Sequence, residues 1–487
     1  MKALAGLASW LFFRLPLAFS VPFGLILLWW VRYGFRWFND GVVGPIAADL
    51  GELAGVGAFV HALLVVVLFL AGILLAYNAA ALVNWFAVAL NLKPVYYAAG
   101  SPQVPPTVDV ADDPLAHVRR IGIVLAGGGG KGAHQAGAIK AIYRFLAEHN
   151  ALDKVKVISS TSIGSWNALF WLAHLIKPEQ GWDGRSIHER WWRAISAKSL
   201  AAPTLYVPLR NNAVLSSLPW QQVFDRIFGR PDVSGQLLRT GIHFYLTRSN
   251  VRTGKLECAT NNPAPPPVTH VTYESLDPND PGEYLSGLKA AVFASMDLPP
   301  LFPYVHRDGK LFEDGGVIDN LPIAFAAASD ENCDLIFILP LSSDFEEEPD
   351  RTSILLRLLR VMDVRQGVLE RSGFKLLYLY NELAALRKHA ESAGPTPVQP
   401  DAPAALASAL QRKNDVTTVF AVCPLKSFVR ATIDTRELWK RKQAGIAFEV
   451  MRDATAGLLK GHPFRPQDVI RVALVDRDGS VTWNDRF

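Results

Sequence analysis

Hydrophobic residues are distributed unevenly along the chain, and the first 92 residues contain two long uncharged stretches. One covers residues 15–31, and the other covers residues 53–92, which hold no Asp, Glu, Lys or Arg. A helix of about 20 apolar residues crosses a bilayer. The pattern predicts an N-terminal membrane segment at 1–98, with spans at about 15–33 and 54–77. Because a helix over all of 53–92 would be about 60 Å long, twice the hydrocarbon thickness, we expect the chain to leave the bilayer near Asn78.

Each stretch also has an alternative interpretation. Residues 1–31 resemble a cleaved signal peptide in having Lys2 ahead of an apolar run, but Arg14 interrupts that run and no clear A-x-A cleavage site follows. A buried core helix is the alternative for residues 53–92. Their length and lack of charge favour a membrane helix instead.

Beyond a Pro-rich linker at 99–117, short apolar runs alternate with helical patterns. The predicted strands lie at 120–130 (ending in a glycine turn), 154–162, 242–247, 310–313 and 335–341, the predicted helices at 133–149 and 165–176, and a further strand, helix and strand within 415–487. Such alternation gives a mostly parallel sheet covered on both faces. We place this α/β domain at 118–465, with a Pro/Ala-rich loop at 391–405 and a C-terminal strand and tail at 466–487.

Charge and cysteine content narrow the possible functions. The chain has 49 basic and 45 acidic residues, a balance that argues against a dedicated nucleic-acid binder. Its three cysteines, Cys258, Cys333 and Cys423, lie far apart and are odd in number. They indicate buried thiols in a reducing compartment, which favours a cytoplasmic location for the α/β domain.

A run of glycines, Gly127 to Gly132 with Lys131 inside it, lies between the first predicted strand and helix. Glycines let successive N–H groups point at one spot beside a helix N-terminus, which suits a phosphate or an oxyanion. Gly127, Gly129 and Gly132 also match the dinucleotide pattern G-x-G-x-x-G. That hypothesis needs an acid at the end of the second strand, but Asp153 lies before this strand.

Two further segments carry candidate chemistry. The sequence from Ser160 to Gly164 lies between a strand and a helix, which is the context of a G-x-S-x-G nucleophile elbow around Ser162. Asp314 follows a predicted strand and precedes Gly315 and Gly316, where a carboxylate can accept a proton. Taken singly, the serine suits a helix N-cap and the Asp-Gly pair a turn. Together, at these strand ends, they indicate a catalytic site.

The three motifs resemble those of the patatin-like phospholipases, over about residues 118–345. The resemblance implies a three-layer patatin-like α/β/α domain and a carboxylic ester hydrolase that acts on membrane phospholipids or other acyl lipids, without cofactor or metal. Ser162 would be the nucleophile and Asp314 the base. The N–H groups of Gly128, Gly129 and Gly130 would hold the oxyanion, and Lys131 would steady the loop or attract phosphate. Motif support comes from Gly127, Gly132, Gly164, Gly315 and Gly316.

The chain departs from the family pattern at two positions. Ser160 replaces the first glycine of the elbow, and Asp297 stands where the family tends to have a small residue. Ser160 motivates an alternative function, a catalytically weak lipid-binding or scaffold protein on the same fold. A Ser-acid-His triad is a rival mechanism, for which His389 and His462 have the right order, whereas His134 is interpreted as a packing or capping residue.

The segment 353–380 carries several arginines among apolar residues, including Arg365 and Arg371. This pattern suits a helix that lies on anionic headgroups, and also an ordinary packed helix with a solvated face. The sequence leaves both interpretations open.

Overall fold

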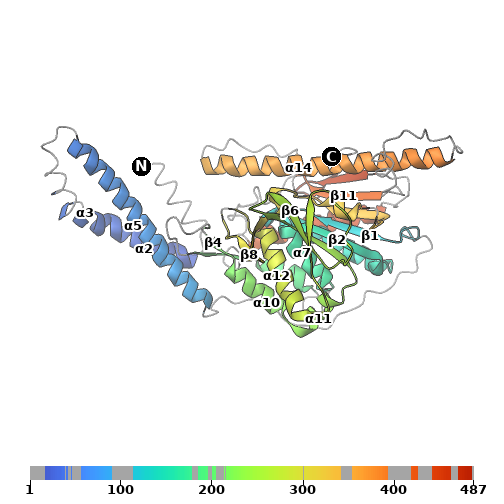
Figure 1. Cartoon of the computed structure of the whole chain (residues 1–487), viewed down its shortest axis with the longest axis horizontal. Coiled ribbons are helices and arrows are strands. Elements are labelled where there is room, and N and C mark those ends of the chain that lie inside the picture. Colours follow the sequence, from blue (N-terminus) through green and yellow to red (C-terminus); the bar gives the residue numbers. More distant parts are fainter. Residues whose placement is uncertain are drawn as a thin grey trace. The chain divides into compact units, whose positions relative to one another are not determined.

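The computed structural model describes residues 17–38, 40–41, 45, 56–89, 113–177, 185–195, 200–204, 213, 215–299, 301–328, 330–341, 354–392, 418–425, 441–461 and 470–484 (Figure 1). Residues 99–112 of the predicted linker, 393–405 of the predicted loop and His462 lie outside these ranges. The chain divides into two compact units. The first comprises 1–95, 197–223 and 299–303, and the second comprises 96–196, 224–298 and 304–487.

The first unit contains two apolar helices that pack against each other. Helix α2 (Leu17–Trp29) continues through a π-helical turn η1 (Trp30–Gly34) into α3 (Phe35–Phe38), and it contacts α5 (Val56–Ala89). Gly72, Ala76 and Ala80 recur every four residues on α5, and both alanines are fully buried. Small residues at this spacing let two helices approach closely, as in membrane helix pairs. Strands β3 (Ala202–Pro203) and β4 (Leu215–Ser216) form a separate antiparallel pair.

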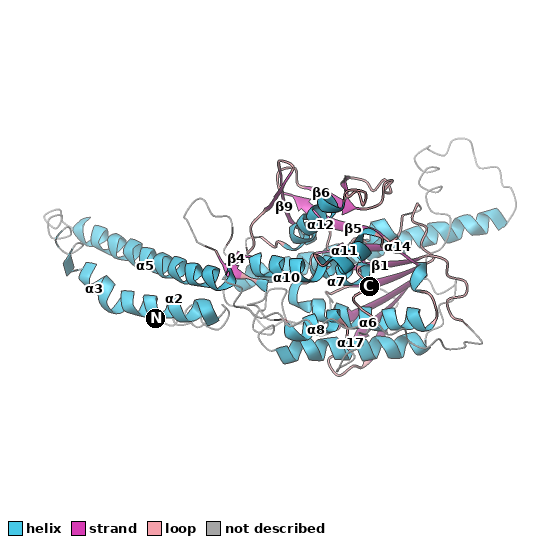
Figure 2. Ribbon diagram, turned by 90° about the horizontal axis from the view of Figure 1, so that it is seen from below, coloured by secondary structure: helices cyan, strands magenta, loops and turns pink. Residues whose placement is uncertain are grey.

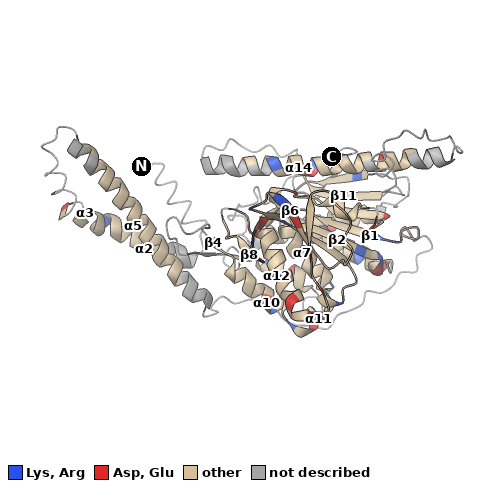
Figure 3. Ribbon diagram, viewed as in Figure 1, with Lys and Arg blue, Asp and Glu red and all other residues tan. Residues whose placement is uncertain are grey.

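Among the described residues, one helix is long and apolar enough to cross a membrane. Its apolar part is Ala62–Val83, 22 residues with a mean hydropathy of 2.5, and α5 carries no charged residue (Figure 3). The helix continues unbroken to Ala89, past the bilayer exit that we expect near Asn78. The Asn78 side-chain amide donates to the Leu74 carbonyl 3.0 Å away within the same helix.

The second unit is built on a mostly parallel sheet. Its strands are β1 (Ile121–Leu125), β2 (Val155–Thr161), β5 (His243–Asn250), β6 (Lys255–Thr260), β7 (Val271–Ser275), β8 (Val305–Arg307), β9 (Lys310–Asp314), β10 (Leu335–Leu339), β11 (Thr418–Pro424), β12 (Ile470–Val475) and β13 (Val481–Asn484). The order is β13-β12-β11-β10-β1-β2-β5-β6-β7, and β9 pairs with β5 and β8. Along this order, the strands from β12 to β5 are parallel to one another. Strand β13 is antiparallel to β12, and both β6 and β9 are antiparallel to β5.

Helices cover both faces of this sheet (Figure 2). They are α6 (Gly132–Glu148), α7 (Ile163–Leu172), α8 (Ile187–Ala194), α11 (Pro231–Leu238), α12 (Pro281–Met296), α13 (Ile323–Ala326), α14 (Ile354–Ser392) and α17 (Arg441–Gly461), while α10 (Leu218–Phe228) extends from the first unit into the second. Alternate side chains of a strand point to opposite faces. On β5, Phe244 accordingly packs against Tyr284 of α12, and Tyr245 stacks on Phe325 of α13. The expected α/β architecture is therefore confirmed.

Candidate active site

The register of β5 brings Ser162 and Asp314 together. One edge of β5 pairs with β2 from His243 to Thr247, where Thr247 lies opposite Thr161. From Arg248 onward the same edge pairs with β9, and Arg248 lies opposite Asp314. The end of β2 therefore abuts the end of β9. The next residue after β2 is Ser162, and the last residue of β9 is Asp314.

Ser162 occupies a sharp turn between β2 and α7. Its backbone has φ 52° and ψ −126°, a conformation that residues other than glycine rarely adopt and that is typical of nucleophile elbows. The turn is tight, because a Cβ on Gly164 would lie 2.5 Å from the Leu125 carbonyl oxygen. Ser160 fits beneath it as the donor of a hydrogen bond to Ser165 Oγ, 3.2 Å away. The elbow conformation is thus present with serine at 160.

The Ser162 hydroxyl donates a hydrogen bond to Asp314, with 2.7 Å between Oγ and Oδ2. The other carboxylate oxygen, Oδ1, accepts from the Gly316 N–H at 2.7 Å, so the carboxylate is held from two sides. Both side chains are buried, since Ser162 is 8% exposed and Asp314 is 3% exposed. The arrangement provides a hydroxyl whose proton has an acceptor already in contact.

Burial raises the pKa of Asp314 to about 7, and the hydrogen bonds from Ser162 and Gly316 oppose this rise only in part. A base with a pKa near neutrality both accepts and returns a proton readily. Asp297 lies next to this carboxylate in the structure, since the Asp314 N–H donates to the Asp297 carbonyl at 3.2 Å. Burial, and then the negative charge of Asp314, raise the pKa of Asp297 well above its usual range, which favours a neutral Asp297.

The glycine-rich loop lies directly against Ser162. A Cβ on Gly127 would meet Ser162 Cβ at 2.9 Å, and Gly129 has φ 53°. Within the described part of the chain, the N–H groups of Gly128, Gly129 and Gly130 have no hydrogen-bond acceptor. They form a set of donors available to a substrate oxygen beside the serine.

Lys131 and His134 follow the loop at the start of α6. Lys131 is 6% exposed, and its carbonyl oxygen lies 3.1 Å from Nδ1 of the buried His134, which fixes the ring hydrogen on that nitrogen. Burial lowers the pKa of His134 to about 4, so the ring is neutral. This agrees with the packing interpretation of His134. Of the two triad candidates, the backbone of His389 lies in the last turns of α14, and His462 is outside the described residues.

Two supporting residues carry no motif and were not predicted. Ser295 accepts the Ser162 N–H at 2.8 Å and contacts Ser165, so it anchors the elbow from α12. Asn320 forms two hydrogen bonds with Gly127. Its backbone carbonyl accepts from the Gly127 N–H at 3.0 Å, and its side-chain amide donates to the Gly127 carbonyl at 3.2 Å. A short polar side chain four residues after Gly316 is the only sequence signal for Asn320.

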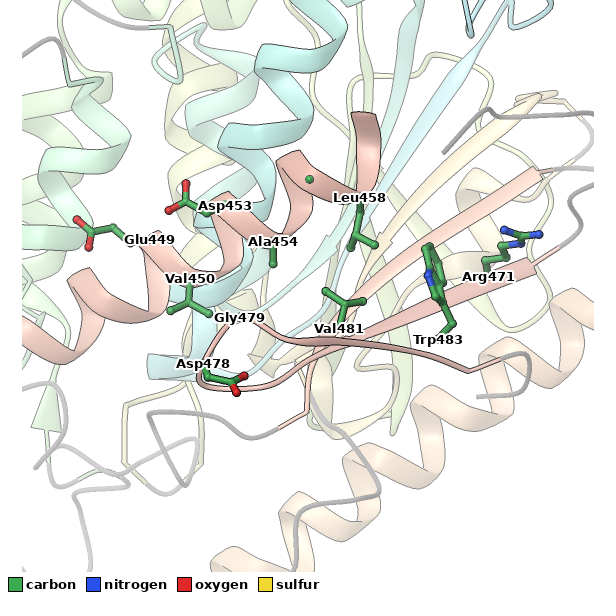
Figure 4. A pocket seen from close by; sticks show the side chains of 11 residues that line it. Glu449, Val450, Asp453, Ala454, Leu458, Arg471, Asp478, Gly479, Val481 and Trp483 are labelled. Atoms are coloured by element: carbon green, nitrogen blue, oxygen red, sulfur yellow. The ribbon is translucent and has the colours of Figure 1, made fainter. Parts of the chain in front are cut away.

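No group of three or more His, Cys, Asp or Glu side chains in the described ranges could hold a metal ion. A cavity of about 830 Å³ lies elsewhere, between α17 and the β12–β13 hairpin (Figure 4). Its lining includes Glu449, Asp453, Arg471, Asp478 and Trp483, and none of the site residues contributes to it. All three cysteines are buried, and they form no disulfide.

Gly164→Ala should damage both stability and activity. The added methyl would press on backbone oxygens of Leu125 and Ala126, which cannot rotate away, so we expect a loss of about 1–3 kcal/mol and a displaced serine. Thermal denaturation and ester turnover measure the two effects. The matched control is Gly457→Ala, because a Cβ there has no atom within 4 Å; this variant should retain activity and stability. Equal behaviour of the two variants would contradict the argument.

A family profile and a solved structure are similar to this chain. The sequence profile of the patatin-like phospholipase family matches residues 123–327, which contain the glycine loop, Ser162 and Asp314. No curated protein matches the chain. Among solved structures, the chain is similar to VipD from Legionella pneumophila at 13% identity, with a TM-score of 0.30 over 77% of this chain and 73% of that one. The resemblance seen in the sequence is confirmed, and the chain carries a patatin-like phospholipase domain.

Proposed function

We propose that the protein is a membrane-bound serine hydrolase that cleaves acyl esters of lipids, of the phospholipase A or lysophospholipase type. The observation that carries the proposal is the 2.7 Å hydrogen bond from Ser162 Oγ to Asp314 Oδ2, made by a serine with elbow backbone geometry. Family membership of the domain supports lipid ester hydrolysis in general. The Ser-Asp dyad and the membrane-bound form are our specific assignments.

In the first half-reaction, Ser162 Oγ attacks the ester carbonyl carbon while its proton passes to Asp314. The carbonyl oxygen becomes an oxyanion, held by the N–H groups of Gly128, Gly129 and Gly130. The ester C–O bond then breaks, and the leaving alcohol takes the proton from Asp314. In the second half-reaction, water gives its proton to Asp314 and attacks the acyl-serine. Ser162 leaves with that proton, and a fatty acid is released.

The proposed attachment to the membrane has two spans, formed by the α2 region and by α5. Side chains along α5 such as Phe59, Leu70 and Leu75 are more than half exposed, which is unfavourable in water and favourable in lipid. We place the hydrolase domain on the cytoplasmic side, since Cys258, Cys333 and Cys423 form no disulfide. An anchor of this kind keeps the enzyme close to its lipid substrate.

The anchor can be tested by extraction of membranes with alkaline carbonate. The unmodified protein should stay in the membrane pellet. Replacing the exposed residues Val66 and Leu70 with arginine places two charges at the centre of α5, each costing about 2.5–3.5 kcal/mol in a bilayer, and should release a large fraction. Ser234→Arg, at a partly exposed position of α11, is the control and should stay in the pellet. Complete extraction of the unmodified protein would refute the anchor.

The second candidate function is a lipid-binding or scaffold protein with weak catalysis. It is favoured by Ser160 in the elbow and by the small exposure of Ser162, which is 8%. A fluorophosphonate probe separates the two functions, because it reacts only with an activated serine. Labelling of folded protein, mapped to Ser162 by peptide mass spectrometry and absent after denaturation, supports the hydrolase. Lack of labelling in folded protein, together with lipid binding, supports the scaffold.

A further inference from the structure

Helix α14 presents a row of apolar side chains to solvent, which we name the outer stripe. Its members are 41–66% exposed. They are Val361, Val364, Val368, Leu376, Leu379, Leu383 and Leu386. At 100° per residue all seven fall within a sector of about 120°, and they extend over about 38 Å of helix. A patch of this length on a soluble surface indicates an interaction site.

The opposite face of α14 is packed against the domain, which fixes the direction of the outer stripe. The buried residues on this face are Gln366, Glu370, Phe374, Leu377, Asn381 and Ala384. Gly373 lies on the same side, where a Cβ would contact Ile323 of α13 at 3.3 Å. The outer stripe is therefore distinct from the face by which α14 packs on the domain.

The charged residues of α14 indicate which kind of partner binds the outer stripe. Basic residues outnumber acidic ones between Ile354 and Ser392. The basic residues are Arg357, Arg360, Arg365, Arg371, Lys375, Arg387 and Lys388, and the acidic ones are Asp363, Glu370, Glu382 and Glu391. Of these acids, Glu370 is fully buried. Arg365 and Lys375 are exposed within the sector of the outer stripe, and the acid Glu382 is exposed at its edge. Among the described residues the exposed charges on this side are therefore two basic and one acidic. Leucine and valine interspersed with basic residues match a helix that lies in the headgroup region of an anionic bilayer.

We propose that the outer stripe of α14 is a docking surface for an anionic lipid bilayer, separate from the membrane helices. The docked helix is connected to the catalytic loop through its buried face. Glu370 accepts a hydrogen bond from the Asn320 amide at 2.5 Å, and the same amide donates to the Gly127 carbonyl. Docking would thus hold the glycine loop in a fixed place relative to the lipid surface, and this last consequence rests on the proposed function.

Site-specific fluorescence in the full chain tests the docking. A cysteine at Leu379 in the outer stripe, labelled with the environment-sensitive dye NBD, reports on α14, and the native cysteines are buried. Arg144→Cys on α6 is the control, since that side chain is 75% exposed. The protein is reconstituted into phosphatidylcholine vesicles with or without about 30 mol% phosphatidylglycerol. We expect a blue shift, and quenching by a lipid-attached nitroxide, at position 379 in anionic vesicles only, and neither at 144.

Two results would overturn the proposal. One is a water-like NBD spectrum at 379 in anionic vesicles. The other is a blue shift that lipid-attached nitroxide does not quench, which would show that protein covers the outer stripe. Because the readout is spectroscopic, it does not depend on whether the protein hydrolyses lipid. A charge variant, Arg365→Gln with Lys375→Gln, should reduce quenching in anionic vesicles towards the level in neutral ones. Unchanged quenching in this variant would also contradict the selection for anionic lipid.

The effect on catalysis provides a second measurement. Leu379→Glu with Leu383→Glu should lower turnover of vesicle phospholipid about tenfold and leave turnover of a soluble short-chain ester unchanged. Equal loss on both substrates, with a lower melting temperature, would assign the outer stripe a structural role and contradict the proposal. Absence of all turnover in the unmodified protein would count against the proposed hydrolase, while the fluorescence result would still decide the docking.

Discussion

Replacing Ser162 with alanine should abolish turnover of a short-chain acyl ester, with a fall in kcat of about 10⁵-fold. Alanine removes the hydroxyl that we propose as the nucleophile and leaves the elbow backbone in place. The measurement is hydrolysis of a chromogenic ester, followed by mass spectrometry of lipid products in mixed-lipid vesicles. The control is Ser234→Ala, a partly exposed serine of α11 whose hydroxyl donates to the Pro231 carbonyl at 3.3 Å, and which should keep full activity.

The Ser162→Ala variant should remain folded, because only the hydrogen bond to Asp314 is lost. Its circular dichroism spectrum and melting temperature at neutral pH should be close to those of the unmodified protein. Activity retained in a folded variant would exclude Ser162 as the nucleophile, and with it the proposed function.

Asp314→Asn should reduce kcat/KM by about 10³-fold or more, since asparagine keeps the shape of the side chain but cannot accept the proton. The proposed role of Asp314 as base requires its carboxylate form in the unmodified protein. With the pKa of Asp314 raised to about 7, kcat/KM should fall about tenfold per pH unit below neutrality and level off above it. A pH–rate profile that is flat from about pH 5 to 8 would contradict Asp314 as the base.

The same substitution should increase stability, and the sign follows from linkage. Folding raises the pKa of Asp314 from 3.8 to about 7, so the folded state binds the proton more tightly than the unfolded chain. The stability from this protonation is present at low pH and is lost as pH rises towards 7. Asp314→Asn removes the buried charge. Its gain in free energy of unfolding should be largest above pH 7 and shrink towards pH 4, as denaturant titrations at several pH values would show. A gain independent of pH would contradict this account.

The sequence predicted the main strands and helices of the parallel sheet, because buried strands such as β1 and β10 are continuous apolar runs. It did not predict β6 or β7, whose charged and polar residues hide the strand pattern. Helix α12 was also missed. It contains Gly282 and Gly287 and has no clear apolar stripe. The apolar pattern is weakest where the sheet turns antiparallel.

Local motifs identified the residues of the candidate site, but they did not show that these residues lie close together in the fold. Ser162 and Asp314 are 152 positions apart, and they are neighbours only because β2 and β9 pair in turn with one edge of β5. This change of pairing partner along β5 depends on where β2 and β9 end, to within one residue. Ser295 and Asn320 belong to the same site, yet a serine in a helix and an asparagine in a loop have many other uses.

The position of β10 limits how the hydrolase region can be shortened. The family match ends at residue 327, but β1, which leads into the glycine loop, has β10 at 335–339 as its neighbour along all five residues. A truncation after 327 would leave β1 as an open edge, with main-chain groups that recruit other chains into aggregates. Strands β11 to β13 extend the same ladder to Asn484. The sheet that supports the glycine loop is therefore considerably longer in sequence than the segment that the family profile matches.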